Sequence, residues 1–200
     1  MRLLSTCLLI FSLLFLLPTP IFAHTEYQFP KVSEGQTTEA LEKLVPLRFL
    51  PSHPLFFLIS AKESVTRFFK PSAVKRAEFD MVLGGKRLKE ATLSLKKGDL
   101  KNASRSLKRY KERLVLLDKQ LVKAQSQNQD VVPLVSRMAD NLQVHETLIF
   151  VIASDWETQE DVYDFDENLS LGISAFIDTV KKIDSIKPGL GGRFKISTKE

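Results

Sequence analysis

The fold is decided by residues 71–127, which read PSAVKRAEFDMVLGGKRLKEATLSLKKGDLKNASRSLKRYKERLVLLDKQLVKAQSQ. On each side of the Gly98-Asp99 pair, apolar residues recur at alternating spacings of three and four, which keeps one apolar seam on each helix. The second seam consists of Leu100, Ala103, Leu107, Tyr110, Leu114, Leu117, Leu121 and Ala124, and the first of Val74, Ala77, Met81, Gly84, Leu88, Ala91 and Leu95. We therefore predict two long helices folded against each other, with Gly98 ending the first and Asp99 capping the second.

Two adjacent glycines interrupt the first of these helices. Gly84 and Gly85 lie in its middle, where each costs up to about 1 kcal/mol relative to alanine. Because Gly84 falls on the seam, we interpret it as the site of a close approach between helices. A functional kink is the alternative.

Further helices are predicted on both sides of this hairpin. A shorter helix starts near Pro54 and ends near Phe69, and a third long helix starts after Asp130 with Pro133 in its first turn. The capping-box spacing of residues 154–157 predicts the start of a last helix, over about 158–186. The predicted fold is all-α: an antiparallel helical bundle of four long helices plus a shorter N-terminal helix, within residues 54–187.

The shorter helix has an apolar side, with Lys62 and Arg67 exposed, and we expect Leu55, Phe57 and Leu58 to dock on the hairpin. This apolar side consists of Leu55, Leu58, Val65, Phe68 and Phe69. Residues 24–53 are predicted to be loosely structured, apart from a short helix over 39–45 capped by Thr37 or Thr38. Residues 188–200 are predicted to form a flexible basic tail.

The N-terminus has the layout of a secretory signal peptide. Arg2 supplies a positive charge, residues 3–17 form an uncharged apolar run, and Ala23 is the small residue at the expected cleavage point. The alternative is an uncleaved membrane anchor, because residues 3–22 are nearly long enough to span a bilayer. Either reading places the rest of the chain outside the cytoplasm, secreted or in the cell envelope.

Composition narrows the range of functions. The single cysteine, Cys7, lies inside the predicted signal peptide, which excludes thiol catalysis, thiolate metal sites and disulfides in the mature chain. The carboxylates of residues 161–167 lack the spacing of a calcium loop, and no Glu-x-x-His pair of a di-iron bundle occurs. His145 falls on an apolar seam, where a hydrogen-bonded core histidine is a simpler interpretation than a metal ligand. We predict no catalytic residue, no metal site and no cofactor.

Charge is distributed unevenly along the chain. The net charge is +5, but residues 62–123 carry 18 basic against 7 acidic side chains, whereas residues 130–167 carry one basic against ten acidic. Such asymmetry indicates either complementarity within the fold or a surface for an anionic partner. The candidate anionic-partner face consists of Lys86, Lys89, Lys96, Lys97, Lys101, Arg105, Lys108, Arg109, Lys119 and Lys123. A solvated outer face without a ligand is the alternative.

A motif near the middle of the chain carries a family resemblance. Residues 50–58 read LPSHPLFFL and residues 68–71 read FFKP, Arg87 opens the segment RLKEA, and Gly98-Asp99 and Tyr110 follow. Over residues 50–125 the chain resembles a family of exported bacterial helical proteins classed as domain of unknown function 5667. Its LPxHPLYxLK motif differs here, since Phe56 replaces the usual tyrosine and Ile59 the usual lysine. The resemblance implies a helical cell-envelope domain with no assigned activity.

These observations lead to a non-enzymatic hypothesis. We expect an exported bacterial helical protein that acts as an interaction module, with an anionic membrane surface, a wall polymer or another envelope protein as candidate partner. Self-association through the helices is also open, whereas nucleic acid is disfavoured by export and by the lack of an aromatic platform. The alternative function is an extracytoplasmic sensor or chaperone-like binder that uses an apolar groove between helices.

Overall fold

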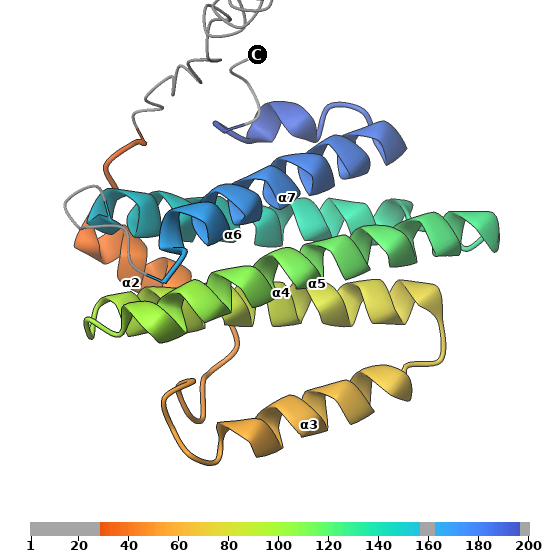
Figure 1. Ribbon diagram of the computed structural model, residues 1–200. Coiled ribbons are helices and arrows are strands. Elements are labelled where there is room, and N and C mark those ends of the chain that lie inside the picture. The colour runs from red at the N-terminus through yellow and green to blue at the C-terminus, as the bar shows by residue number, and fades with distance from the viewer. Residues whose placement is uncertain (1–28, 157–162, 197–200) are drawn as a thin grey trace, which may run out of the picture.

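The computed structural model describes residues 29–156 and 163–196, and this part of the chain contains helices and no strand (Figure 1). The all-α class predicted from the sequence is therefore confirmed. The helices are α2 (Glu34–Lys43), α3 (Phe56–Phe68), α4 (Ala73–Leu95), α5 (Leu100–Ser126), α6 (Val132–Trp156) and α7 (Phe165–Ile186), followed by the 3-10 turn η1 (Gly191–Arg193). Among the described residues, no helix is both long and apolar enough for a membrane span.

The hairpin of α4 and α5 forms as the seam pattern predicts. Gly98 adopts a left-handed φ of 71°, which glycine tolerates, and the Asp99 carboxylate accepts a hydrogen bond from the backbone N–H of Asn102 at 3.2 Å. Every predicted seam position is buried except Val74 and Leu100 at the helix ends, which are half-buried. The heptad-like spacing thus determined which side of each helix meets the other.

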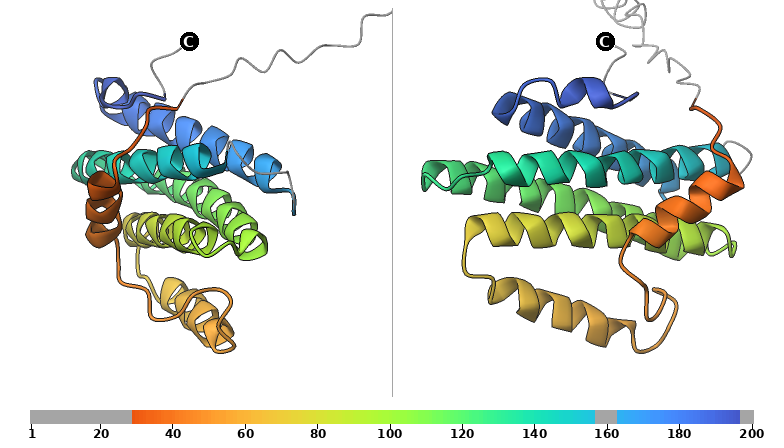
Figure 2. Two further views of the ribbon diagram at one scale, coloured as in Figure 1. Left: turned by 90° about the vertical axis from the view of Figure 1, so that its left-hand side faces the viewer. Right: turned by 180° about the vertical axis from the view of Figure 1, so that it is seen from behind.

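The neighbours of α6 differ from those of an up-down-up-down bundle. α6 packs on α4 and α7 and is crossed by α2 (Figure 2), and it runs parallel to α4. Early in both helices Arg137 pairs with Glu78, and further along both helices the ring of His145 lies next to Gly85. All residues from 148 to 153 are buried, so this part of α6 requires neighbours around its whole circumference.

α7 packs on α5 and on α6. It runs parallel to α5, since Asn168 donates a hydrogen bond to Ser104 near the start of both helices and Thr179 donates one to Asp118 further along. Two neighbouring pairs, α4 with α6 and α5 with α7, are therefore parallel. The antiparallel arrangement expected from short turns holds for the directions of successive helices, but not for all neighbours in space.

The segment before α3 is more ordered than expected. α2 begins after Ser33, whose hydroxyl accepts from the Gln36 N–H at 3.3 Å while the Gln36 side chain accepts from the Ser33 N–H at 3.0 Å. This capping box places the helix start ahead of the predicted caps Thr37 and Thr38. Ala40 is buried in the core, so part of residues 24–53 belongs to the packed domain.

Two predictions near the C-terminus do not hold. Ser154 and Trp156 lie inside α6, so the capping-box spacing of residues 154–157 does not start a helix; α7 begins at Phe165, and residues 157–162 lie outside the described residues. The predicted tail packs back on the bundle up to residue 196. There Phe194 is buried, and Glu146 accepts hydrogen bonds from two backbone N–H groups at 2.6 and 2.9 Å.

The two glycines of α4 are expected to respond differently to alanine. A Cβ at Gly85 would lie 2.7 Å from Leu44 Cδ2 and 2.8 Å from His145 Nε2, whereas a Cβ at Gly84 would meet no atom closer than 3.5 Å. Gly85→Ala should therefore lower the free energy of unfolding by about 1–3 kcal/mol. Gly84→Ala should leave it unchanged or raise it by about 0.5–1 kcal/mol, because alanine favours the helix. Urea denaturation of both variants measures this difference, and equal effects would contradict the tight approach at Gly85.

Candidate functional site

Helix α3 turns its apolar side away from the bundle. In Figures 1 and 2, α3 lies at the edge of the structure, on the side of the bundle formed by α4 and α5. The side chains of Phe57, Phe68 and Phe69 are 64%, 78% and 75% exposed. Leu55, Leu58 and Val65 are exposed as well. The predicted docking of this apolar side on the hairpin is therefore wrong.

The side of α3 that does face the bundle is largely polar. Phe56 and Glu63 are its buried residues, and they lie seven positions apart, which places them on one face. Arg67 continues that face and is only partly exposed, not fully exposed as predicted. α3 is consequently attached mainly through charged groups.

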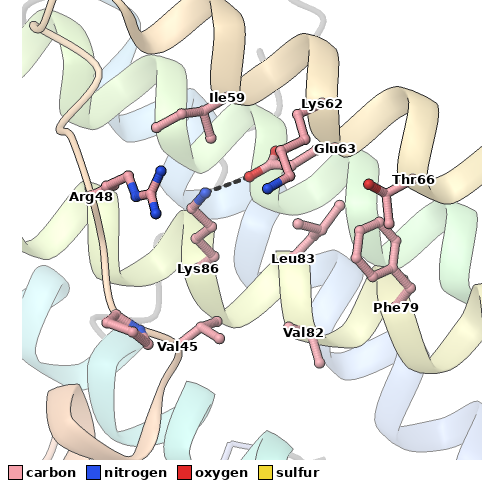
Figure 3. A pocket seen from close by; sticks show the side chains of 11 residues that line it. Val45, Arg48, Ile59, Lys62, Glu63, Thr66, Phe79, Val82, Leu83 and Lys86 are labelled. Carbon is pink, nitrogen blue, oxygen red and sulfur yellow. Dashed lines mark hydrogen bonds and ion pairs between the residues drawn. The ribbon is translucent and has the colours of Figure 1, made fainter.

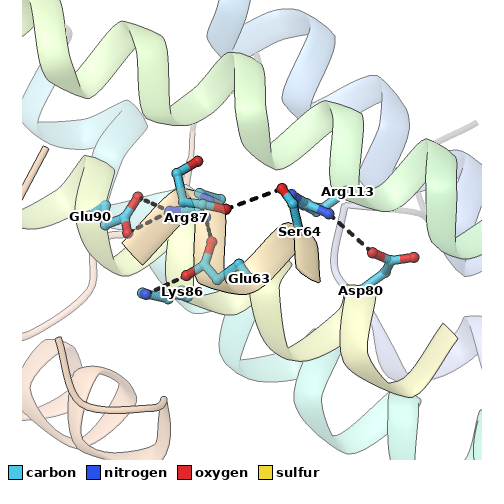
Figure 4. A network of polar contacts seen from close by, with 8 residues as sticks. Glu63, Ser64, Asp80, Lys86, Arg87, Glu90 and Arg113 are labelled. Atoms are coloured by element: carbon cyan, nitrogen blue, oxygen red, sulfur yellow. Dashed lines mark hydrogen bonds and ion pairs between the residues drawn. The ribbon is translucent and has the colours of Figure 1, made fainter. Parts of the chain in front are cut away.

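Glu63 is the centre of a buried charge network (Figure 4). Its carboxylate accepts hydrogen bonds from Lys86 and Arg87 of α4. The second guanidinium nitrogen of Arg87 donates to both oxygens of Glu90, at 2.6 and 2.7 Å. Burial raises the pKa of Glu90 more than the charge and hydrogen bonds of Arg87 lower it. The network therefore positions α3 at a considerable cost in desolvation.

A second ionic contact holds the C-terminal half of α3. The carboxylate of Asp80 is fully buried and accepts two hydrogen bonds from Arg67 Nε, at 2.8 and 3.0 Å, and one from its Nη2, at 2.8 Å. Arg113 of α5 adds a longer bond of 3.3 Å. These charge-assisted bonds fix the rotation of α3 about its axis.

An apolar groove lies between α3 and α4 (Figure 3). It has a volume of about 370 Å³. Its apolar lining consists of Val45, Pro46, Ile59, Phe79, Val82 and Leu83. Arg48, Lys62 and Lys86 supply cationic groups at its walls, with Lys86 bonded to Glu63. An apolar groove between helices is the kind of site that the alternative hypothesis, a sensor or chaperone-like binder, requires.

A second pocket lies on the other side of α3, against α5. Its volume is about 530 Å³, and Arg105 and Arg109 line it together with His53 and residues at the start of α3. The guanidinium carbon of Arg109 lies 5.2 Å from the centre of the Phe56 ring, within cation–π range. The pocket therefore combines two guanidinium groups with the rings of Phe56 and Phe57.

The ten basic residues predicted as one face differ in their partners and in their exposure to solvent. Lys86 is bonded to Glu63, and Lys89 donates hydrogen bonds to backbone carbonyls, at 2.7 Å to Leu41 and 3.4 Å to Leu44. Arg109 is partly buried. The remaining seven are exposed: Lys96, Lys97, Lys101, Arg105, Lys108, Lys119 and Lys123. From Lys101 to Lys123 they extend over about 33 Å of helix, so any one ligand would meet only some of them.

His145 is a core residue. It is 1% exposed, and its Nδ1 lies 3.4 Å from the hydroxyl oxygen of Tyr110. Burial lowers the pKa of His145 to about 3, so the ring is neutral at physiological pH. Among residues 29–156 and 163–196, no three side chains of histidine, cysteine, aspartate or glutamate come together as metal ligands would. Of the acidic group at 161–167, Asp161 lies outside the described residues, and Asp166 accepts a hydrogen bond from Trp156.

The charge network around Glu63 and Asp80 was not predicted from the sequence. The available signal was that acidic residues are few in the basic segment 62–123, and three of them, Glu63, Asp80 and Glu90, are buried. Their helical positions do not reveal that a neighbouring helix brings arginine or lysine opposite them. Only tertiary packing supplies that information.

Comparisons with known proteins provide no further guidance: no protein-family model, curated protein or solved structure matches the chain. The resemblance noted over residues 50–125 therefore stays a prediction from the motif alone.

Proposed function

We propose that this protein is a non-catalytic, exported interaction module of the bacterial cell envelope that docks on anionic lipid surfaces through α3. The observation that carries the proposal is the exposed apolar side of α3, which the polar attachment of this helix keeps turned outward. Large contiguous apolar surfaces are uncommon on monomeric soluble proteins and typically mark an interaction site. The proposal includes export by the predicted signal peptide and membership of the resembled family, and the four long helices then act as a scaffold for α3.

The charges around α3 favour a lipid surface as the partner. Its apolar arc contains Phe57, Leu58, Ala61, Val65, Phe68 and Phe69. Cationic side chains flank this arc on both sides, with Arg105 beside Phe57 in the pocket against α5 and Lys62 in the groove against α4. Aromatic and aliphatic residues flanked by cations are typical of helices that lie in a membrane interface. Each cation close to an anionic surface contributes about 1 kcal/mol.

Removing two aromatic rings from the arc is expected to abolish most of the binding. The double variant Phe57→Ser/Phe68→Ser should bind vesicles of phosphatidylglycerol at least about tenfold more weakly than the unmodified protein, because two exposed rings no longer insert. Its free energy of unfolding should change by less than about 1 kcal/mol, since both rings are already exposed. Vesicle co-sedimentation at low and moderate salt measures the binding.

The matched control is Val122→Ser, which removes an exposed apolar side chain of α5 on the surface it shares with Asp178 and Lys182 of α7. It should leave vesicle binding unchanged. Binding of the unmodified protein should also weaken between low and moderate salt, because ions screen the flanking charges. Equal binding by the double variant and the control, or equal affinity for neutral vesicles, would contradict the proposed docking mode.

A second candidate function rests on the groove of Figure 3. Its apolar lining and volume of about 370 Å³ suit a short apolar segment of an unfolded chain, as in a chaperone-like binder. Such binding should be insensitive to salt and should decrease in Val82→Lys, which places a charge on a groove wall that is partly exposed. Fluorescence anisotropy with a labelled apolar peptide distinguishes this function from lipid docking.

A further inference from the structure

The pocket between α5 and the first turns of α3 has an unusual charge balance. Three arginines at the interface of α3 with the bundle, Arg67, Arg87 and Arg113, bind buried carboxylates. Arg109 lies in the same interface, yet no carboxylate of the described residues is within ion-pair distance of it. One of its terminal nitrogens, Nη1, is buried and has no hydrogen-bond partner in this part of the chain. A buried donor without a partner costs about 1–3 kcal/mol, more when it is charged.

A second guanidinium group lies one helical turn away. Arg105 precedes Arg109 by four residues, which places both on the same face of α5, and both line the pocket. Arg105 is exposed and likewise has no carboxylate within ion-pair distance in the described residues. Burial and the charge of Arg87 lower the pKa of Arg109, whereas Glu90 and Glu112 raise it less. The pocket therefore has an excess of positive potential that a bound anion would relieve.

The other side of the pocket adds donors. The first turn of α3 contributes the positive end of its dipole, although the backbone N–H groups of Leu55, Phe56 and Leu58 already donate to groups of His53 and Leu55. The Nδ1 of His53 accepts a hydrogen bond from the Leu55 N–H at 3.1 Å. In the neutral ring the proton is consequently on Nε2, which makes His53 a donor. Ser60 and Ser64 contribute hydroxyl groups to the lining.

We propose that Arg105 and Arg109 bind a phosphate group in this pocket, with His53 as an additional donor. Guanidinium forks match phosphate oxygens two at a time, and two forks on adjacent turns can bind one tetrahedral anion from two directions. The volume of about 530 Å³ leaves room for the organic part of a phosphate ester. The group is supplied either by free phosphate or by a phospholipid headgroup, and in the second case the inference deepens the proposed function on which it then rests.

The first test uses inorganic phosphate as the probe. Titration calorimetry and amide chemical shifts of the intact protein should show saturable binding, with shifts at residues 53–60 and 105–109. Arg105→Gln should weaken this binding at least about tenfold. The control Lys119→Gln removes the same charge from the same helix, about 21 Å away, and should change the affinity less than about twofold. Equal losses in the two variants would show a general charge effect and would overturn the site.

Two arginine variants complete the design. Arg109→Lys keeps the charge but loses the fork, so it should bind phosphate more weakly than the unmodified protein. Because Arg109 packs on Phe56, the thermal unfolding of Arg109→Lys is measured together with its phosphate binding. Arg105 is exposed, so Arg105→Gln should fold normally and keeps the proposal open to contradiction. Unchanged phosphate binding in Arg105→Gln would overturn the assignment.

The second test separates the two sources of phosphate. If a headgroup supplies it, Arg105→Gln should weaken binding to phosphatidylglycerol vesicles while Lys119→Gln does not. Phosphate binding without any vesicle binding would support the pocket with a free phosphate ligand and would refute the proposed membrane function. Vesicle binding by the unmodified protein, together with no binding of inorganic phosphate, would overturn the pocket while leaving the membrane function intact.

Discussion

Replacing Arg87 with methionine is expected to lower the free energy of unfolding by about 3–5 kcal/mol. Arg87 is 1% exposed and bonds both Glu63 and Glu90, so methionine leaves the buried carboxylate of Glu90 without a partner and that of Glu63 with Lys86 alone. Because Glu63 is on α3 and Glu90 on α4, the loss also weakens the attachment of α3. Urea denaturation followed by circular dichroism at 222 nm measures the change. The dependence of the free energy of unfolding on urea concentration should be the same for the variant and the unmodified protein.

The control for this variant is an exposed ion pair on the same helix. Lys75 pairs with Glu78 at 2.9 Å, and their side chains are 57% and 37% exposed. Lys75→Met should therefore cost less than about 1 kcal/mol. The double variant Arg87→Met/Glu90→Gln should recover part of the stability lost in Arg87→Met, because one of the unpaired charges is removed. Similar losses for Arg87→Met and Lys75→Met would show that water enters the network.

The free energy of unfolding is expected to fall as the pH falls from about 6.5 to about 3 because of His145. In the unfolded chain residue 145 has the ordinary histidine pKa of 6.5, whereas burial lowers the folded pKa to about 3. Between these values the unfolded state binds a proton that the folded state does not, which favours unfolding. The expected loss is about 2 kcal/mol at pH 5 and about 3 kcal/mol at pH 4.

The double variant His145→Leu/Tyr110→Phe isolates this contribution, because it removes the imidazole and leaves no hydroxyl without its partner. The difference in the free energy of unfolding between pH 7 and pH 5 should be about 2 kcal/mol smaller for the variant than for the unmodified protein. Asp118 acts in the opposite direction in both proteins, since burial raises its pKa to about 6 and its protonation at lower pH favours the folded state. Its effect cancels in the comparison. Parallel pH dependences would show that His145 is accessible to protons in the folded protein.

The all-helical class and the hairpin of α4 and α5 could be predicted from the sequence. Seam residues such as Leu107 and Leu114 are buried where their spacing placed them, because a helix can hide only one stripe against one partner. Gly98 and Asp99 fixed the turn through local backbone conformation alone. Of the candidate site, the sequence supplied the basic residues of α5, Arg105 and Arg109 among them. These features depend on residues close in the chain.

The side of α3 that faces inward could not be predicted, because it depends on contacts between helices. A pattern of apolar residues predicts that a helix buries its apolar side, but Glu63 and Arg67 meet charged partners 13 to 24 positions away in the chain. Those contacts turn Phe57 and Phe68 outward and create the two cavities beside α3. The parallel pairing of α4 with α6 was likewise decided by packing, since α6 is apolar around much of its circumference and its own sequence does not select a neighbour. Long-range charge pairing and the choice among apolar faces depend on partners that no local spacing encodes.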